Sequence, residues 1–98
     1  MTIKLKTTRV RPNTGVQWKT EASDDAAHSY YNETYVNAGK VTGVSNSETE
    51  LTKISIKNFA TTADKDAFIA DLANSSSPLY ARTQYNTANG ITLTHEVI

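Results

Sequence analysis

Three stretches of the chain alternate apolar and polar residues with the period of two that is typical of β-strands. The first begins with Ile3 and Leu5, another covers residues 52–57, and the last covers residues 91–98. A shorter apolar segment, residues 41–44, precedes the polar residues 45–49, which are typical of a hairpin loop. We therefore expect four strands, the second and third joined as a hairpin.

The segment after the first strand has helical spacing instead. Ala27, Tyr31 and Tyr35 recur every four residues, so they share one face of a helix. Ser23 is a favourable N-cap, and Gly39 is a favourable residue just beyond the C-terminus. This helix should therefore lie between the first strand and the hairpin.

A second helical region follows the hairpin. Thr61 or Thr62 can cap its start, and Phe68 and Leu72 form its inner face. Pro78 then fits the first position of another helical segment, which residues 89–90, Asn-Gly, should end.

The element order is βαββαβ, which predicts a ferredoxin-like α+β fold in one domain, residues 1–98. Its four-stranded antiparallel sheet should carry both helical regions on one face. In this topology the first and third strands are central neighbours, and the last strand flanks the first.

The alternation also assigns side chains to the two faces of the sheet. The core under the helices is expected to contain Ile3, Leu5, Tyr31, Tyr35, Ile54, Ile56, Phe68, Leu72, Ile91 and Leu93. The opposite face is expected to carry Lys4, Lys6, Thr8, Lys53, Ser55, Lys57, Thr92, Thr94 and Glu96. That polar face is either solvated or a wet interface with a second subunit.

Composition narrows the classes of function. Ten basic residues balance ten acidic ones, so no overall field attracts nucleic acid or an anionic membrane. RNA-binding sheets of this topology stack bases on aromatic residues, but Lys and Ser occupy those central positions here. The absence of Cys excludes disulfides and thiolate chemistry. No run of residues resembles a signal peptide or a membrane span.

Few residues suggest catalysis. His28 is interpreted as a surface histidine of the first helix, and His95 as a hydrogen-bonded, half-buried residue of the last strand. Their separation gives no metal-ligand spacing, and the aspartates fit helix starts and exposed faces. We therefore expect no catalytic, cofactor-binding or metal-binding residues and no cofactor.

Large aromatics without a place in the predicted core suggest an interface. Trp18, Tyr30 and Tyr80 are of the types enriched at protein–protein hot spots. The second strand, with Val41 and Val44, has little charge to protect it as a sheet edge. These five residues are the interface candidates.

Two short motifs resemble known proteins. Residues 9–14, RVRPNT, and residues 85–93, YNTANGITL, resemble small uncharacterised virion proteins of tailed bacteriophages, especially marine phages of cyanobacteria. The order of elements also resembles the dimeric α+β barrel group, which includes monooxygenases of antibiotic biosynthesis; this likeness concerns the fold and transfers no residue.

The phage resemblance implies a non-enzymatic structural protein of the virion, in the capsid, neck or tail. It would bind other virion proteins and copies of itself, and neither nucleic acid nor a membrane. Two alternatives stay open. One is a small dimeric enzyme or ligand-binding protein of the α+β barrel type, and the other is an adaptor module that binds a host protein.

Overall fold

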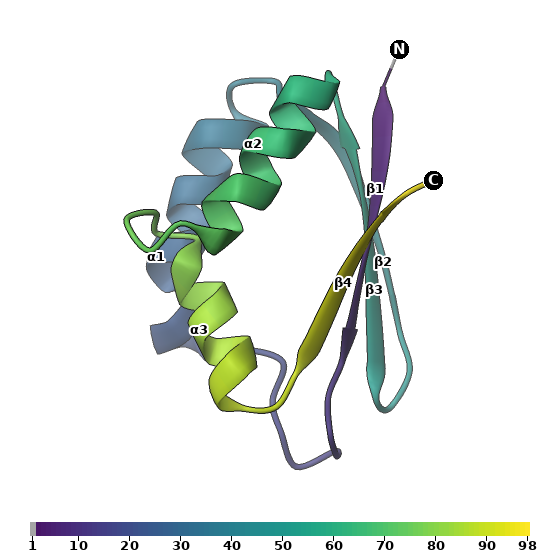
Figure 1. Ribbon diagram of the computed structural model, residues 1–98, viewed down its shortest axis with the longest axis vertical. Coiled ribbons are helices and arrows are strands. Elements are labelled where there is room, and N and C mark those ends of the chain that lie inside the picture. Colours follow the sequence, from purple (N-terminus) through teal and green to yellow (C-terminus); the bar gives the residue numbers. More distant parts are fainter. Residues whose placement is uncertain (1) are drawn as a thin grey trace.

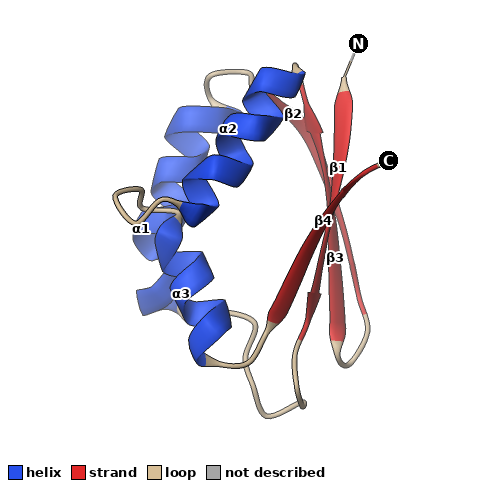
Figure 2. Cartoon of the chain, viewed as in Figure 1, coloured by secondary structure: helices blue, strands red, loops and turns tan. Residues whose placement is uncertain are grey.

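A computed structural model describes residues 2–98, with the side chains of residues 21–23 outside the description. Three helices and a short π-helical turn lie on one face of a four-stranded sheet, and the other face carries no helix (Figures 1 and 2). The elements are β1 (Ile3–Val10), α1 (Glu21–Tyr31), η1 (Asn32–Val36), β2 (Val41–Glu48), β3 (Thr52–Phe59), α2 (Thr62–Ala73), α3 (Tyr80–Ala88) and β4 (Thr92–Val97). No helix among the described residues is long and apolar enough to cross a membrane.

The sheet has the predicted order. β1 and β3 are the central strands, β2 pairs with β3, β4 pairs with β1, and every pair is antiparallel. This is the ferredoxin-like α+β fold expected from the sequence. β2 and β4 are the edge strands, and β2 carries an irregularity between Val41 and Gly43.

The helix boundaries follow the local signals in part. The Thr61 hydroxyl accepts a hydrogen bond from the Asp64 backbone N–H, as the N-cap prediction requires. Gly39 adopts a positive φ of 74° shortly after η1, which a glycine accommodates without strain. That helix already begins at Glu21, so the backbone does not place Ser23 at the predicted N-cap. The Ser23 side chain lies outside the described residues.

The core lies between the helices and the sheet and contains part of the predicted set. Leu5, Tyr31, Tyr35, Phe68 and Ile91 are buried as expected, and Ile3 and Leu72 are partly buried against them. Leu93 is mainly at the surface, with 37% of its area exposed. Buried residues that the sequence prediction omitted are Ala27, Val41, Phe59 and Leu79.

The predicted facing of β3 is wrong. Leu5 is directly opposite Lys57 and Thr7 is opposite Ser55, and directly opposed residues of an antiparallel pair point to the same face. Leu5 and Thr7 are buried, so Lys57 and Ser55 also point toward the helices.

Ile54 and Ile56, placed in the core from the sequence, lie instead on the helix-free face opposite Thr8 and Lys6. A one-residue error in a strand with period two exchanges its entire faces. Lys53, Ser55 and Lys57 are therefore not part of the helix-free face, as the alternation had suggested.

Candidate functional site

With β3 facing this way, a cavity of about 270 Å³ with both polar and apolar walls lies between the sheet and the helices. All four strands supply polar side chains, and the helices supply aromatic and charged ones. The lining residues include Thr7 and Arg9 of β1, Lys53, Ser55 and Lys57 of β3, His95 of β4, Tyr31 of α1, Phe68 of α2 and Arg82 of α3. Trp18, in the loop between β1 and α1, also lines the cavity.

Lys57 lies deepest among the cations. Its Nζ is 5.8 Å from the centroid of the Tyr31 ring and 5.4 Å from that of Phe68, and it donates a hydrogen bond of 3.2 Å to the Ser55 hydroxyl. Burial, followed by the charges of Arg82, Arg9 and Lys53, lowers the pKa of Lys57 from 10.5 to about 8. The amine therefore occupies a site that disfavours its charged form.

The neighbouring cations are also desolvated, but two nearby carboxylates, Asp24 and Glu48, act on both in the opposite direction. Burial and then the charge of Arg82 lower the pKa of Arg9, and burial and then the charge of Arg9 lower the pKa of Lys53. None of Arg9, Lys53 and Lys57 forms an ion pair with a described side chain. The inner face of the sheet thus carries three clustered cations that form no direct ion pair with the described side chains.

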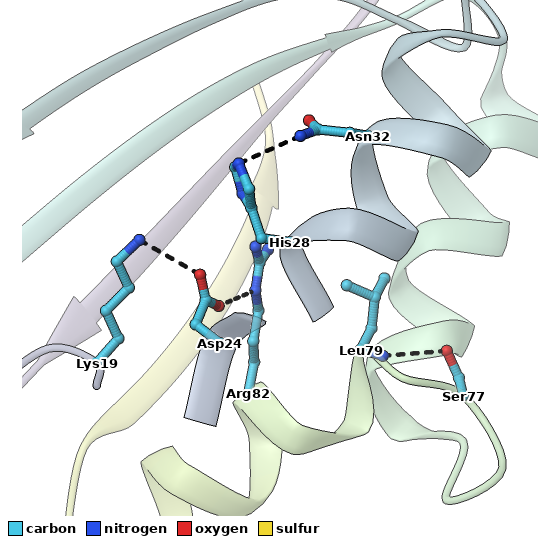
Figure 3. A network of polar contacts seen from close by, with 7 residues as sticks. All are labelled: Lys19, Asp24, His28, Asn32, Ser77, Leu79 and Arg82. Atoms are coloured by element: carbon cyan, nitrogen blue, oxygen red, sulfur yellow. Dashed lines mark hydrogen bonds and ion pairs between the residues drawn. The ribbon is translucent and has the colours of Figure 1, made fainter. Parts of the chain in front are cut away.

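Asp24, on α1, is the acidic side chain that lines the cavity, and it is already paired (Figure 3). Its carboxylate accepts a hydrogen bond of 2.7 Å from Arg82 Nε and one of 3.3 Å from Lys19 Nζ. Burial alone would raise the pKa of Asp24, but Arg82 and Lys19 hold it below its ordinary value. Asp24 therefore ties α1 to α3, and the terminal nitrogens of Arg82 form no hydrogen bond with the described residues.

His95 is the half-buried, hydrogen-bonded histidine that the sequence predicted. Its Nδ1 is 2.8 Å from the Thr7 hydroxyl, across the β1–β4 pair. Burial, and then the charge of Lys57, lower its pKa from 6.5. At neutral pH the imidazole is therefore mainly uncharged and can accept or donate a proton.

The Tyr31 hydroxyl is the unusual polar group of the site. The residue is 7% exposed, and its hydroxyl oxygen is buried without a hydrogen-bond partner among the described residues. By contrast, the hydroxyls of Tyr30 and Tyr35 both donate to the Asp71 carboxylate. A buried hydroxyl without a hydrogen-bond partner costs free energy, so Tyr31 is a polar group that the fold leaves unsatisfied among the described residues.

The interface candidates occupy different environments. Trp18 is half-buried in the cavity wall, where its ring lies 4.8 Å from the Arg11 guanidinium and its Nε1 donates to Glu48. Tyr30 packs against the core, and Tyr80 is half-buried at the start of α3. Val44 is 48% exposed at the cavity, whereas Val41 is a core residue with 6% exposure. An interface at Val41 could therefore use only its backbone.

The other histidine takes no part in the cavity. His28 is exposed on α1, and its Nε2 is 3.2 Å from the Asn32 amide nitrogen. No three His, Asp or Glu side chains in the described part of the chain lie close enough together to hold a metal ion.

The sequence prediction missed the cavity because it placed Ile54 and Ile56 inward. Phe59 was the available signal. It is the largest apolar residue of the strand, it is fully buried, and it shares a face with Ser55 and Lys57 by the period of two. Placing Phe59 in the core first would have turned both lysines toward the helices.

Comparisons with known proteins support the fold. No family model matches the chain, and no curated protein does. One similar structure is a dimeric ferredoxin-like protein from an uncultured marine organism, at 16% identity and a TM-score of 0.60, covering 99% of this chain and 94% of that one. Another is a protein of unknown function from Nitrosomonas europaea, at 18% identity and a TM-score of 0.52, covering 100% and 90%. At these identities the likeness concerns the fold alone.

Proposed function

We propose that the protein binds a small organic anion in the cavity between its sheet and its helices. The observation that carries this proposal is the cluster formed by Arg9, Lys53 and Lys57, which line one cavity and have no carboxylate partner among the described side chains. Partly buried like charges repel one another and lose hydration, so an anion that neutralises them gains free energy.

The walls indicate what the rest of the ligand is. Tyr31, Phe68 and Trp18 supply aromatic surface next to the cations, and Leu72 and Leu93 add aliphatic surface. A cavity of about 150 Å³ holds benzene, so a volume of about 270 Å³ suits a molecule of one ring or a short chain with one acidic group.

The first test is binding of benzoate by the purified protein, measured by calorimetry and by the shift of the melting temperature. Benzyl alcohol, which has the same ring without the charge, is the matched ligand. We expect benzoate to bind and raise the melting temperature, because a ligand that binds only the folded state stabilises it. Benzyl alcohol should bind at least tenfold more weakly.

Variants locate the binding site. Lys53→Met removes a cation from the cavity, and Lys4→Met removes the same charge from the helix-free face. Lys53→Met should weaken benzoate binding about tenfold or more, since a hydrogen bond to a charged group contributes roughly 1.5–3 kcal/mol. Lys4→Met should change it less than about twofold. Equal effects of the two variants, or no binding by the wild type, would reject the proposal.

We also propose that two copies of the chain associate through the helix-free face. One of the similar structures is described as dimeric. Ile54 and Ile56 lie on this face of the central strand β3, next to Thr8 and Lys6 of β1. Lys6 is directly opposite Glu96 of β4, so the face carries both signs of charge for a self-complementary contact.

The role in a virion predicted from the sequence stays a prediction. It is compatible with self-association, and its test is the detection of the protein in purified particles by mass spectrometry.

A further inference from the structure

Lys57 is placed for a reaction as well as for charge recognition. Its amine lies in the cavity beside two aromatic rings, and no carboxylate among the described residues holds it as an ammonium ion. Two of its nearest electrostatic neighbours, Arg82 and Arg9, are permanent cations that line the same cavity. A lysine in apolar surroundings beside other cations is the arrangement that activates an amine as a nucleophile.

We propose that Lys57 forms a Schiff base with the keto group of a small 2-oxo acid whose carboxylate is held by the neighbouring cations. This proposal rests on the proposed anion binding and names the substrate class of the same cavity. The arginines recognise the carboxylate, and the carbonyl carbon, one bond away from it, meets the amine.

Formation of the Schiff base needs only the lysine amine and the keto acid, and it releases one molecule of water. The lone pair of the neutral Lys57 amine attacks the keto carbon, and the carbonyl oxygen becomes the hydroxyl of a carbinolamine. The two amine protons then leave with that oxygen as water, and a carbon–nitrogen double bond forms. His95, which lines the same cavity and is mainly neutral at pH 7, can pass a proton between nitrogen and oxygen.

The environment makes the neutral amine available. With a pKa of about 8, roughly a tenth of the Lys57 amines are neutral at pH 7, against well below ~0.1% for an ordinary lysine. Burial is the first cause of this shift, followed by the repulsion from Arg82. Exposed lysines such as Lys4 provide an internal comparison in the same molecule.

The experiment is reductive trapping. The protein is incubated with pyruvate and sodium cyanoborohydride at pH 7, which converts an imine into a stable N-carboxyethyl lysine, and the modified residue is identified by peptide mass spectrometry. We expect Lys57 to be labelled at least tenfold more than any other lysine. Excess benzoate should suppress the labelling, and acetone, a ketone without a carboxylate, should label Lys57 far less than pyruvate.

Three variants separate the chemistry from the charge. Lys57→Arg keeps the positive charge but cannot form the imine, so it should lose the adduct, and its affinity for benzoate, measured alongside, reports the charge separately. Lys57→Met removes both properties and serves if the arginine does not fit. Lys4→Met, on the helix-free face, should be labelled at Lys57 like the wild type.

The outcomes distinguish the two proposals. Benzoate binding by the wild type without preferential labelling of Lys57 would overturn the Schiff base and leave the anion site standing. Labelling spread evenly over the lysines would have the same meaning. A protein that binds neither benzoate nor pyruvate would overturn both proposals.

Discussion

At the residue scale, Lys57 places a charged amine at a position where core packing alone would favour an apolar side chain. Lys57 is in contact with the rings of Tyr31 and Phe68, which belong to the core, and its pKa falls to about 8. A difference of one pKa unit corresponds to ~1.4 kcal/mol between the two protonation states. The charged lysine therefore lowers the stability of the ligand-free protein, as binding residues often do.

Replacing Lys57 with Met tests this cost directly. Lys57→Met should raise the free energy of unfolding at pH 7 by roughly 1–3 kcal/mol, because a similar apolar chain replaces a desolvated charge. Urea melts measure the difference, and Lys4→Met is the matched control. A loss of stability in Lys57→Met would show that the amine makes a favourable contact that outweighs its desolvation.

The same experiment has a defined pH dependence. The folded pKa of Lys57 is about 8 and its ordinary value is 10.5, so between these values the unfolded chain binds more protons than the folded one. The contribution of Lys57 to wild-type stability should therefore rise as pH increases from about 8 to 10.5. The advantage of Lys57→Met should be full below pH ~8 and should vanish above pH ~10.5.

At the element scale, β3 is a strand with two different partly apolar faces. Phe59, Lys57 and Ser55 face the helices, whereas Ile54 and Ile56 face away from them. β-Branched residues suit a strand on either face, so strand propensity is equally satisfied by both orientations. The helices decide between them, because Phe68 packs directly against Phe59 with ring centroids 5.4 Å apart.

Alanine substitutions on β3 report its facing. Phe59→Ala should cost about 3–5 kcal/mol, since it empties a fully buried site in the core. Ile56→Ala should cost clearly less, because Ile56 is half-buried on the helix-free face. Urea melts at a protein concentration below that of self-association make the comparison. A larger loss of unfolding free energy for Ile56→Ala than for Phe59→Ala would show that Ile56, not Phe59, faces the core.

At the scale of the whole molecule, the two proposed surfaces are separate. The cavity opens between the helices and the face of the sheet that they cover, and the proposed contact between copies uses the helix-free face. β1 and β3 contribute alternate residues to both. Ligand binding and self-association can therefore be disturbed one at a time.

The contact between copies is tested by sedimentation. The wild type should be a dimer. Ile54→Glu should make it a monomer, because it places an unpaired charge on the central strand of the helix-free face. Circular dichroism establishes that the variant is folded, and benzoate binding should remain. Leu51→Glu, in the β2–β3 loop, is the control and should stay dimeric. A monomeric wild type, or a dimeric Ile54→Glu, would contradict the proposal.

Local signals in the sequence determined the element order and several boundaries. The alternation around Ile3 and Leu5, the Thr61 cap and the glycine at position 39 are short-range features, and each depends on neighbours within a few residues. Together with the preference for short connections, they were sufficient for the strand order of the sheet.

The cavity was decided only by the tertiary structure. Residues 53–57, KISIK, alternate perfectly, but alternation does not say which face the helices cover. Apolar residues were assigned inward by default, and the inward positions hold Lys57 and Ser55 instead. The facing of β3 depends on the packing of Phe59 against Phe68. The cavity also needs Arg9, Arg82 and His95, which come from distant parts of the chain. Long-range packing of this kind has no counterpart in local spacing, because it depends on which strands and helices meet in space.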